Sequence, residues 1–258
     1  MALGTAAFIM FIFLCGAIAG SFLNVCIYRL PLGVDVVWKS SSCIHCGCRL
    51  RWFDMIPILN WFILKGRCRC CKGPISIQYP IIELLNGILW VETFLRFGFS
   101  FTSLWYGACI SALLVLSVID WRTYKIPIGC NLWIFGMGAG NLFTECMAKG
   151  LSKAGGFLAG AFVISGFLEL IAVLTKGRAI GGGDIKLTFA AGLLLGWKGI
   201  LWAFLIGCIA GSLIHPIFIK WKNKERILAF GPYLSFGIWV SMMWGQQLSD
   251  WYAGYLFG

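Results

Sequence analysis

The chain has 258 residues, of which 60% are hydrophobic and only 12% are charged, and its mean hydropathy is +0.86. These values exclude an ordinary soluble domain and indicate an integral membrane protein. The net charge of +11 does not indicate nucleic-acid binding, because the basic residues form no stripe interleaved with aromatic residues. We therefore expect an all-α polytopic membrane protein that contacts membrane lipid and no nucleic acid.

Seven apolar runs are long enough to cross about 30 Å of hydrocarbon as helices. The first run has no basic residue before it and continues directly into NVCIYRLP, so we expect a retained span rather than a cleaved signal peptide. An eighth run, residues 187–197, is too short to span alone and is predicted as a half-helix or a segment packed against protein. This gives about eight membrane segments, the longer ones at about 5–28, 80–97, 101–120, 127–147, 154–175, 199–219 and 228–248.

The basic residues separate by side when residues 29–79 are placed in the cytoplasm and the spans alternate. Seventeen of the 21 Lys and Arg residues then lie on the cytoplasmic side, Lys224 and Arg226 among them. By the positive-inside rule, this distribution predicts a cytoplasmic loop at 29–79 and both termini on the opposite side.

Six of the twelve cysteines lie in this loop, in CIHCGC at 43–48 and CRCC at 68–71. Two CxxC pairs at this separation are typical of a structural zinc site with four thiolate ligands, and a reducing cytoplasm favours metal over disulfides. Unligated thiols are the alternative, and Cys48, Cys70 or His45 could substitute in the ligand set. The predicted zinc ligands are Cys43, Cys46, Cys68 and Cys71.

Two carboxylates are predicted at the same membrane depth on the cytoplasmic side. Asp120 ends the third span, in IDWRTYKIP at 119–127, and Asp184 follows three glycines in IGGGDIK at 180–186. Ionisable groups at this depth are costly and usually functional, and two neighbouring carboxylates tend to share one proton, as in an aspartic protease. The alternative is that both acids only neutralise basic side chains at helix ends.

Other mechanisms lack their residues in this sequence. The only histidines are His45 and His215, which excludes an HExxH metalloprotease, and no GxSxG provides a serine nucleophile. A zinc-stabilised transporter or scaffold remains as a non-enzymatic alternative, although no pair of inverted repeats is apparent. The glycine-rich stretches 136–140 and 155–162 are predicted to let helices pack closely rather than to bind a ligand.

Taken together, the motifs resemble the type IV prepilin leader peptidase family of intramembrane aspartyl proteases. The central features are the GxGD turn and an upstream aspartate at the end of another span. The resemblance extends over nearly the whole chain, in GSFLNVCIYRLP at 20–31, the two CxxC pairs, DMIPILNW at 54–61, GRCRCCKGPIS at 66–76, YPIIELL at 79–85, IDWRTYKIP, IGGGDIK and FGPYLSFG at 230–237.

The resemblance implies a bifunctional enzyme of the bacterial inner (cytoplasmic) membrane. Asp120 and Asp184 would cleave the basic leader of type IV prepilins or type II secretion pseudopilins after a glycine, with the active site facing the cytoplasm. The amino-terminal segment with its cysteine loop would then methylate the new amino group with S-adenosylmethionine. Asn24, Arg29 and Glu83 flank the loop and are candidate contacts for this cofactor or for the amine.

The expected division is therefore a first span at 1–28, a zinc-binding loop at 29–79 that forms the methyltransferase part with its flanking spans, and membrane helices at 80–258 that carry the protease site. A peptidase without methylation is a further alternative. The sequence leaves the oligomeric state open.

Overall fold

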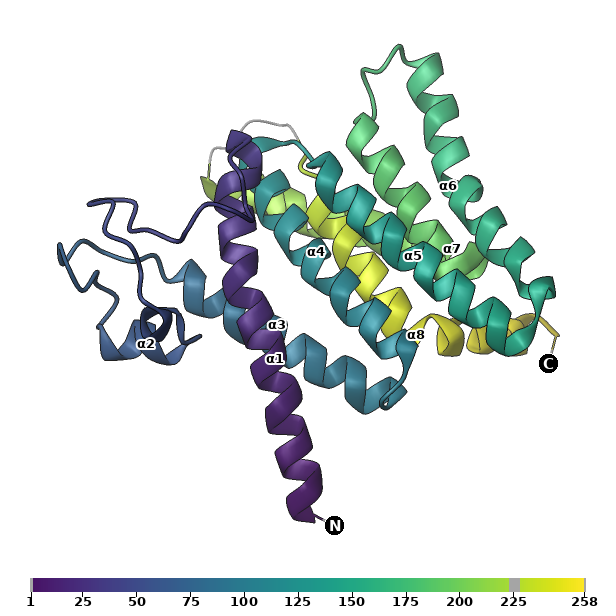
Figure 1. Cartoon of the computed structure of the whole chain (residues 1–258). Helices are drawn as coiled ribbons and strands as arrows, with labels where there is room; N and C mark the ends of the chain where they lie inside the picture. The colour runs from purple at the N-terminus through teal and green to yellow at the C-terminus, as the bar shows by residue number, and fades with distance from the viewer. Residues whose placement is uncertain (1, 223–227, 258) are drawn as a thin grey trace. The chain divides into compact units, whose positions relative to one another are not determined.

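A computed structural model describes residues 2–222 and 228–257, and every regular element within these ranges is a helix (Figure 1). Lys224 and Arg226, two of the basic residues assigned to the cytoplasmic side, lie outside the described residues. The chain forms two compact units, Met1–Ser103 and Leu104–Gly258, and each is described by itself.

Unit 1 contains two long helices, α1 (Ala2–Arg29) and α3 (Gln78–Phe97), which pack against each other. Gly16 of α1 lies against Gly87 of α3 so closely that a Cβ on either residue would collide with the opposite helix. Asn86 is completely buried and donates a hydrogen bond of 2.7 Å to the carbonyl of Gly16. Small residues and a side-chain amide therefore join these two apolar helices, as is common within membranes.

The loop between α1 and α3 contains only short helical turns. Arg29, the last residue of α1, is buried, and its guanidinium donates to the backbone carbonyls of Asp35, Lys39 and Ser40 at 2.7–3.1 Å. These bonds hold the start of the loop against the end of the helix. The helical turns of the loop are η1 (Leu30–Leu32), η2 (Trp52–Met55) and α2 (Leu59–Ile63).

Unit 2 is a bundle in which α7 packs against α5, α6 and α8. The indole N–H of Trp133 on α5 donates to the carbonyl of Ala108 on α4, which joins α4 to the bundle. The helices are α4 (Phe101–Thr123), which begins at the end of unit 1, α5 (Ile128–Lys149), α6 (Ala154–Leu174), α7 (Gly182–Lys222) and α8 (Gly231–Phe257), with a short turn η3 (Leu151–Lys153) before α6.

α7 is broken at Gly196, where φ is +73° and ψ is 175°. Only glycine adopts this backbone conformation readily, so the helix stops at this residue and then starts again. The first part, residues 182–195, contains the short apolar segment and extends back to Asp184 in its first turn. The half-helix expected at 187–197 is thus present, and it is joined to its polar flank.

Glycines permit the close packing around this first part of α7. A Cβ on Gly160 of α6 would lie 2.6 Å from the carbonyl oxygen of Gly192, and a Cβ on Gly138 of α5 would lie 3.1 Å from the backbone nitrogen of Leu194. The two glycine-rich stretches therefore serve helix packing, as the sequence predicted.

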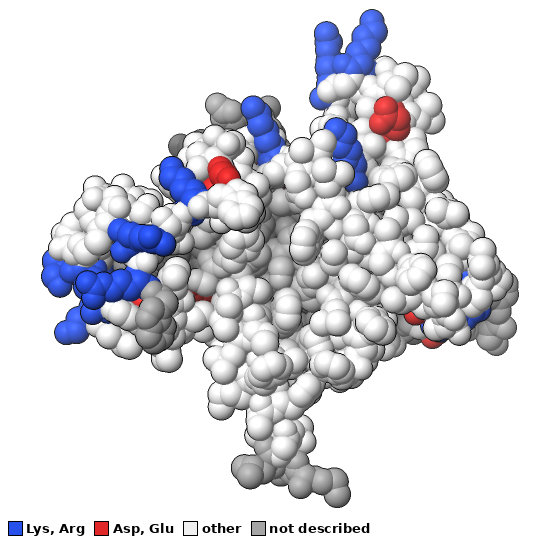
Figure 2. Space-filling model, in the orientation of Figure 1, with Lys and Arg blue, Asp and Glu red and all other residues white. Residues whose placement is uncertain are grey.

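Four helical segments within the described ranges are long and apolar enough to cross a membrane: Gly4–Leu32, Phe101–Thr123, Leu151–Leu174 and Gly182–Ile217. Figure 2 agrees with this, because Lys and Arg gather over the loop of unit 1 and at the turn between α6 and α7, while the flanks of the long helices are nearly uncharged. The chain is a multi-pass, all-helical membrane protein, as expected. The helices α3, α5 and α8 lie where spans were expected, but the count of about eight segments stays a prediction.

Candidate functional site

Asp120 and Asp184 both lie in unit 2, each at the end of a helix. Asp120 is in the last turn of α4 and is only 5% exposed, whereas Asp184 is in the first turn of α7 and is half-buried. The charge of Asp120 acts directly on Asp184, so the two carboxylates lie within electrostatic range of each other. The chain therefore brings together two acids that are 64 positions apart in the sequence.

A third helix end meets Asp120. The backbone N–H of Gly231, the first residue of α8, donates a hydrogen bond of 2.9 Å to Oδ2 of Asp120. A Cβ at Gly231 would lie 2.7 Å from this oxygen, so only glycine fits. The positive end of α8 also favours negative charge on the carboxylate. We did not assign Gly231 a role from the sequence, although Pro232 after it is a sign of a helix start.

Asp184 follows a glycine turn that brings backbone close to the carboxylate. Its N–H donates to the carbonyl of Gly181 at 3.1 Å, and Gly183 lies against the side chain of Ile126. Oδ1 of Asp184 is buried and has no hydrogen-bond partner within the described residues. A buried acceptor without a donor is costly, so this oxygen is available to a water or a substrate group.

The two carboxylates differ in their surroundings, because Asp120 has a fixed donor, whereas Oδ1 of Asp184 has no partner in the part of the chain that the structure describes. Two acids in such an arrangement can hold one proton between them. One member can then take a proton from water while the other gives a proton to a carbonyl oxygen.

The sulfur atoms of Cys43, Cys46, Cys68 and Cys71 all lie within 4.8 Å of one another in unit 1. Zn–S bonds of about 2.3 Å in a tetrahedron separate the sulfurs by about 3.8 Å, and those of Cys43 and Cys71 are 3.9 Å apart. The backbone N–H groups of Cys71 and Cys70 lower the pKa of Cys68 to about 6, which favours its thiolate. The four thiols therefore fit a structural zinc ion with no open coordination position.

Each CxxC pair lies in a tight turn whose ends are joined by an antiparallel bridge, at 42–49 and 67–74. Gly47 and Lys72 both have positive φ, of +69° and +59°, directly after the second cysteine of each pair. Their N–H groups donate back to the carbonyl of the first cysteine of the pair. The two turns thus have the same local design, which points the sulfurs of each pair in one direction.

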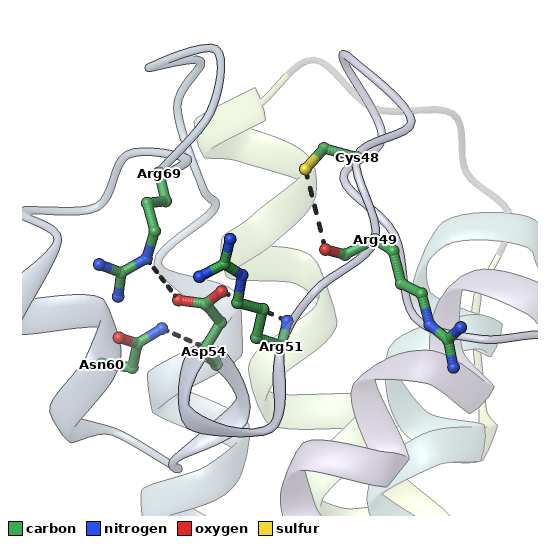
Figure 3. A network of polar contacts seen from close by, with 6 residues as sticks. All are labelled: Cys48, Arg49, Arg51, Asp54, Asn60 and Arg69. Carbon is green, nitrogen blue, oxygen red and sulfur yellow. Dashed lines mark hydrogen bonds and ion pairs between the residues drawn. The ribbon is translucent and has the colours of Figure 1, made fainter.

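The three other candidate ligands lie outside this group. The ring of His45 lies against Gly73. The thiol of Cys48 contacts the carbonyl of Arg49 at 3.8 Å, as Figure 3 shows. Cys70 interacts with the Cys48 thiol, and this hydrogen bond raises the pKa of Cys70 to about 11.

A cavity of about 520 Å³ lies in unit 1, between the loop and the ends of α1 and α3 that the loop connects. This volume is in the range of small-molecule sites. Asn24, Arg29 and Glu83 all line the cavity, so the structure brings together the three residues proposed for cofactor contact. Tyr79 and Trp61 add aromatic surface to its wall.

The polar residues of this cavity are held in place by the backbone around them. The amide of Asn24 donates to the carbonyl of Tyr79 at 3.2 Å and accepts from the side chain of Gln78 at 3.3 Å. Oε2 of Glu83 accepts a hydrogen bond of 2.7 Å from the backbone N–H of Ile58. Together with the bonds of Arg29, these contacts fix the wall of the cavity.

Glu83 bonds to a strained residue. Ile58 has φ +62° and ψ −59°, a conformation that a β-branched side chain rarely adopts. Nearby, the buried Asn60 donates to the carbonyl of Asp54 at 2.6 Å. Backbone strain of this kind persists only where the surroundings fix it, and it gathers at ligand sites.

Asp54 is a second carboxylate at the cavity, and it lies at the centre of the network in Figure 3. Its Oδ1 accepts from Nε of Arg69 at 2.8 Å, and its Oδ2 accepts from the backbone N–H of Arg51 at 3.3 Å. The side chain of Asp54 is 7% exposed. It links the second cysteine turn to η2. We did not single out Asp54 from the sequence, although it begins the motif DMIPILNW.

Two family descriptions match the chain. Residues 14–97 match the bacterial peptidase A24 N-terminal domain, and residues 107–215 match the type IV leader peptidase family. No solved structure matches the chain. Similar curated proteins include the prepilin leader peptidase/N-methyltransferases of Legionella pneumophila and Xanthomonas campestris pv. campestris, which are 32% and 33% identical to this chain. Each alignment covers 92% of this chain and 91% of the relative. The chain belongs to the type IV leader peptidase family.

Proposed function

We propose that this protein cleaves the leader peptide of type IV prepilins or type II secretion pseudopilins after a glycine and then N-methylates the new terminal residue. The observation that carries the proposal is that Asp120 and Asp184, at the ends of α4 and α7, lie within electrostatic range of each other in a chain of this family. The printed names of the relatives, prepilin leader peptidase/N-methyltransferase, support both activities.

The aspartate pair supplies the acid–base chemistry of the cleavage. Asp120 accepts a hydrogen bond from the Gly231 N–H, which stabilises its ionised form. We therefore propose that Asp120 accepts the proton of the attacking water. Asp184 holds the shared proton and gives it to the oxygen of the scissile carbonyl, which forms a neutral diol. The roles reverse on collapse of the diol, and a proton passes to the leaving amine.

The glycine turn at 181–183 allows the backbone of an extended peptide to approach Asp184, because no side chain blocks it. We place this site on the cytoplasmic side of the bacterial inner membrane. The support is the distribution of basic residues, since seventeen of 21 lie on one side when the spans alternate.

We assign the methyl transfer to the cavity in unit 1. When bound, S-adenosylmethionine supplies the methyl group and carries a positive charge on its sulfur. The buried carboxylate of Glu83 provides a negative group on the cavity wall for such a cation or for the substrate amine. Asn24 and Arg29 hold the cavity in shape through their bonds to the loop and to α3.

We assign the four clustered cysteines to a structural zinc ion that ties the two turns of the loop together. The loop has many apolar residues but few that are buried, so it needs such a cross-link to hold one conformation. The transporter or scaffold alternative has no support from the family to which the chain belongs. The peptidase without methylation remains to be separated by experiment.

The test follows both reactions in the same tubes. Detergent-purified wild type, Asp120→Asn and Asp184→Asn are incubated with a prepilin-like peptide, or with a pre-cut peptide, and a labelled methyl donor. We expect the wild type to cut and methylate, and both variants to lose cleavage but to methylate the pre-cut peptide. Cleavage at the wild-type rate by either variant would refute the aspartate pair. Cleavage without methylation by the wild type would support the peptidase-only alternative.

A further inference from the structure

Asn131 on α5 reaches the turn that carries Asp184. It is 5% exposed, and its Nδ2 donates a hydrogen bond of 3.3 Å to the carbonyl of Gly183, the residue directly before Asp184. The reverse orientation of the amide would place two oxygens against each other, so the network fixes Nδ2 toward Gly183. Oδ1 of Asn131 is buried and has no partner within the described residues.

A second asparagine on the same helix provides an internal comparison. Asn141 is 2% exposed, donates to the carbonyl of Leu194 at 3.1 Å, and also has a buried Oδ1 without a partner in the described ranges. Its role follows from the break at Gly196, which removes the helical partners of the carbonyls just before it. Asn141 therefore satisfies a carbonyl that the broken helix leaves open.

This explanation does not apply to Asn131. Gly183 lies at the beginning of α7, where the open groups of a helix are N–H groups rather than carbonyls. The hydrogen bond from Asn131 is thus not required to complete the helix, and the buried Oδ1 has a cost in stability. What the bond does fix is the start of α7, where three successive glycines, 181–183, lead into Asp184 and provide no side chain of their own to pack against a neighbouring helix.

Only a few contacts anchor this turn. Ile126 lies against Gly183 from one side, and the N–H of Asp184 bonds to Gly181 within the turn itself. Within the described ranges, Asn131 donates the one side-chain hydrogen bond that these glycines receive from another helix. A carboxylate that must share a proton with a partner needs a defined separation from it, and that separation depends on this anchor.

We propose that Asn131 is a positioning residue for the cleavage reaction: through the carbonyl of Gly183 it sets the place of the Asp184 carboxylate relative to Asp120. This inference rests on the proposed function. It concerns a residue that does not touch the reacting atoms, so it predicts a loss of turnover without a loss of substrate binding.

The test compares Asn131→Leu with Asn141→Leu, a matched control on the same helix that removes an equally buried amide bonded to the same part of α7. Leucine has a shape similar to asparagine and no polar atoms. We expect Asn131→Leu to lower kcat for cleavage by roughly tenfold to a hundredfold with KM within about twofold. The pH dependence of kcat should also change shape, because the two apparent pKa values of a carboxylate pair depend on their separation.

Asn141→Leu should keep kcat within about twofold of wild type and keep the wild-type pH profile, even where its melting temperature falls as much as that of Asn131→Leu. Equal effects of the two substitutions on kcat, with unchanged pH profiles, would overturn the inference, because both amides would then act only in stability. Asn131→Ser is the second variant where leucine prevents folding. Its hydroxyl is too short to reach the carbonyl, and the same loss of kcat is expected.

Asp184→Asn, measured in parallel, distinguishes a failure of the proposed function from a failure of the positioning role of Asn131. If Asp184→Asn cleaves at the wild-type rate, the proposed function fails. If it is inactive while Asn131→Leu and Asn131→Ser turn over like the wild type, the positioning role alone fails.

Discussion

The two units use polar side chains in opposite ways. In unit 1, Asn24, Arg29 and Glu83 all have hydrogen-bond partners, and these bonds hold a loop that has little apolar core. In unit 2, glycine contacts between helices provide the packing, while Oδ1 of Asp184 and Oδ1 of Asn131 have no partner in the part of the chain that the structure describes. Polar groups thus hold the first site together, whereas in the second the carboxylate of Asp184 keeps an oxygen available for chemistry.

The largest expected effect tests whether the two sites are separate. Asp120→Asn and Asp184→Asn should each reduce cleavage by roughly 10³-fold or more, because one proton can no longer be shared. Methylation of a pre-cut peptide should stay within about twofold of wild type, since the cavity lies in the other unit. Loss of both activities in either variant would show that the units act as one site.

The second prediction concerns the proposed zinc site, which cross-links the loop of unit 1. Cys43→Ser and Cys68→Ser should lose bound zinc and methyl transfer, whereas Cys48→Ser and Cys70→Ser should retain about one zinc per chain. Acidification should release the metal, because protons compete for the thiolates. Elemental analysis of the purified variants measures the effect. Zinc that is lost only with Cys48 or Cys70 would contradict the assignment of ligands.

The third prediction tests the fit of α8 against Asp120. Gly231→Ala should lower cleavage by roughly tenfold to a hundredfold, because the new Cβ would lie 2.7 Å from the carboxylate oxygen. Gly254→Ala on the same helix is the control, since a Cβ there meets no atom within 4 Å. Comparable initial rates for the two variants would remove Gly231 from the site.

The smallest effect is expected at Glu83. Glu83→Ala removes the acceptor of the Ile58 N–H and should lower methyl transfer by roughly tenfold or somewhat more. Glu83→Gln keeps an acceptor oxygen and tests the charge alone. If the glutamine variant methylates like the wild type while the alanine variant does not, Glu83 holds the strained turn and does not bind a cation. Cleavage should be unaffected by both substitutions.

The sequence was sufficient to predict the helices and the cysteine cluster, because both depend on the spacing of residues along the chain. The helices α1 and α3 to α6 lie within a few residues of the apolar runs, whereas α7 joins two runs and α8 continues to Phe257, beyond the predicted end at 248. The two CxxC pairs converge as their spacing predicts. The contacts of Gly231 with Asp120 and of Asn131 with Gly183 could not be predicted, because they join positions 111 and 52 residues apart. Such contacts depend on how the helices pack, and local sequence patterns do not predict them.

The residue at which α7 breaks was also not predicted. A short apolar segment was recognised at 187–197, but nothing distinguishes Gly196 from the many other glycines of the chain until its positive φ is known. Asp54 was missed for a related reason. Its role depends on hydrogen bonds from Nε of Arg69 and from the backbone N–H of Arg51, and these two residues come from different turns of the loop.

The position of Asn131 and Asn141 has a mechanical consequence. Both residues belong to α5, and they bond the two ends of the first part of α7, at Gly183 and at Leu194. The remainder of α7 is joined to that part through Gly196, where the helix is broken. The segment that carries Asp184 is therefore bonded to α5 at both of its ends, and we expect a shift of α5 to carry the carboxylate with it.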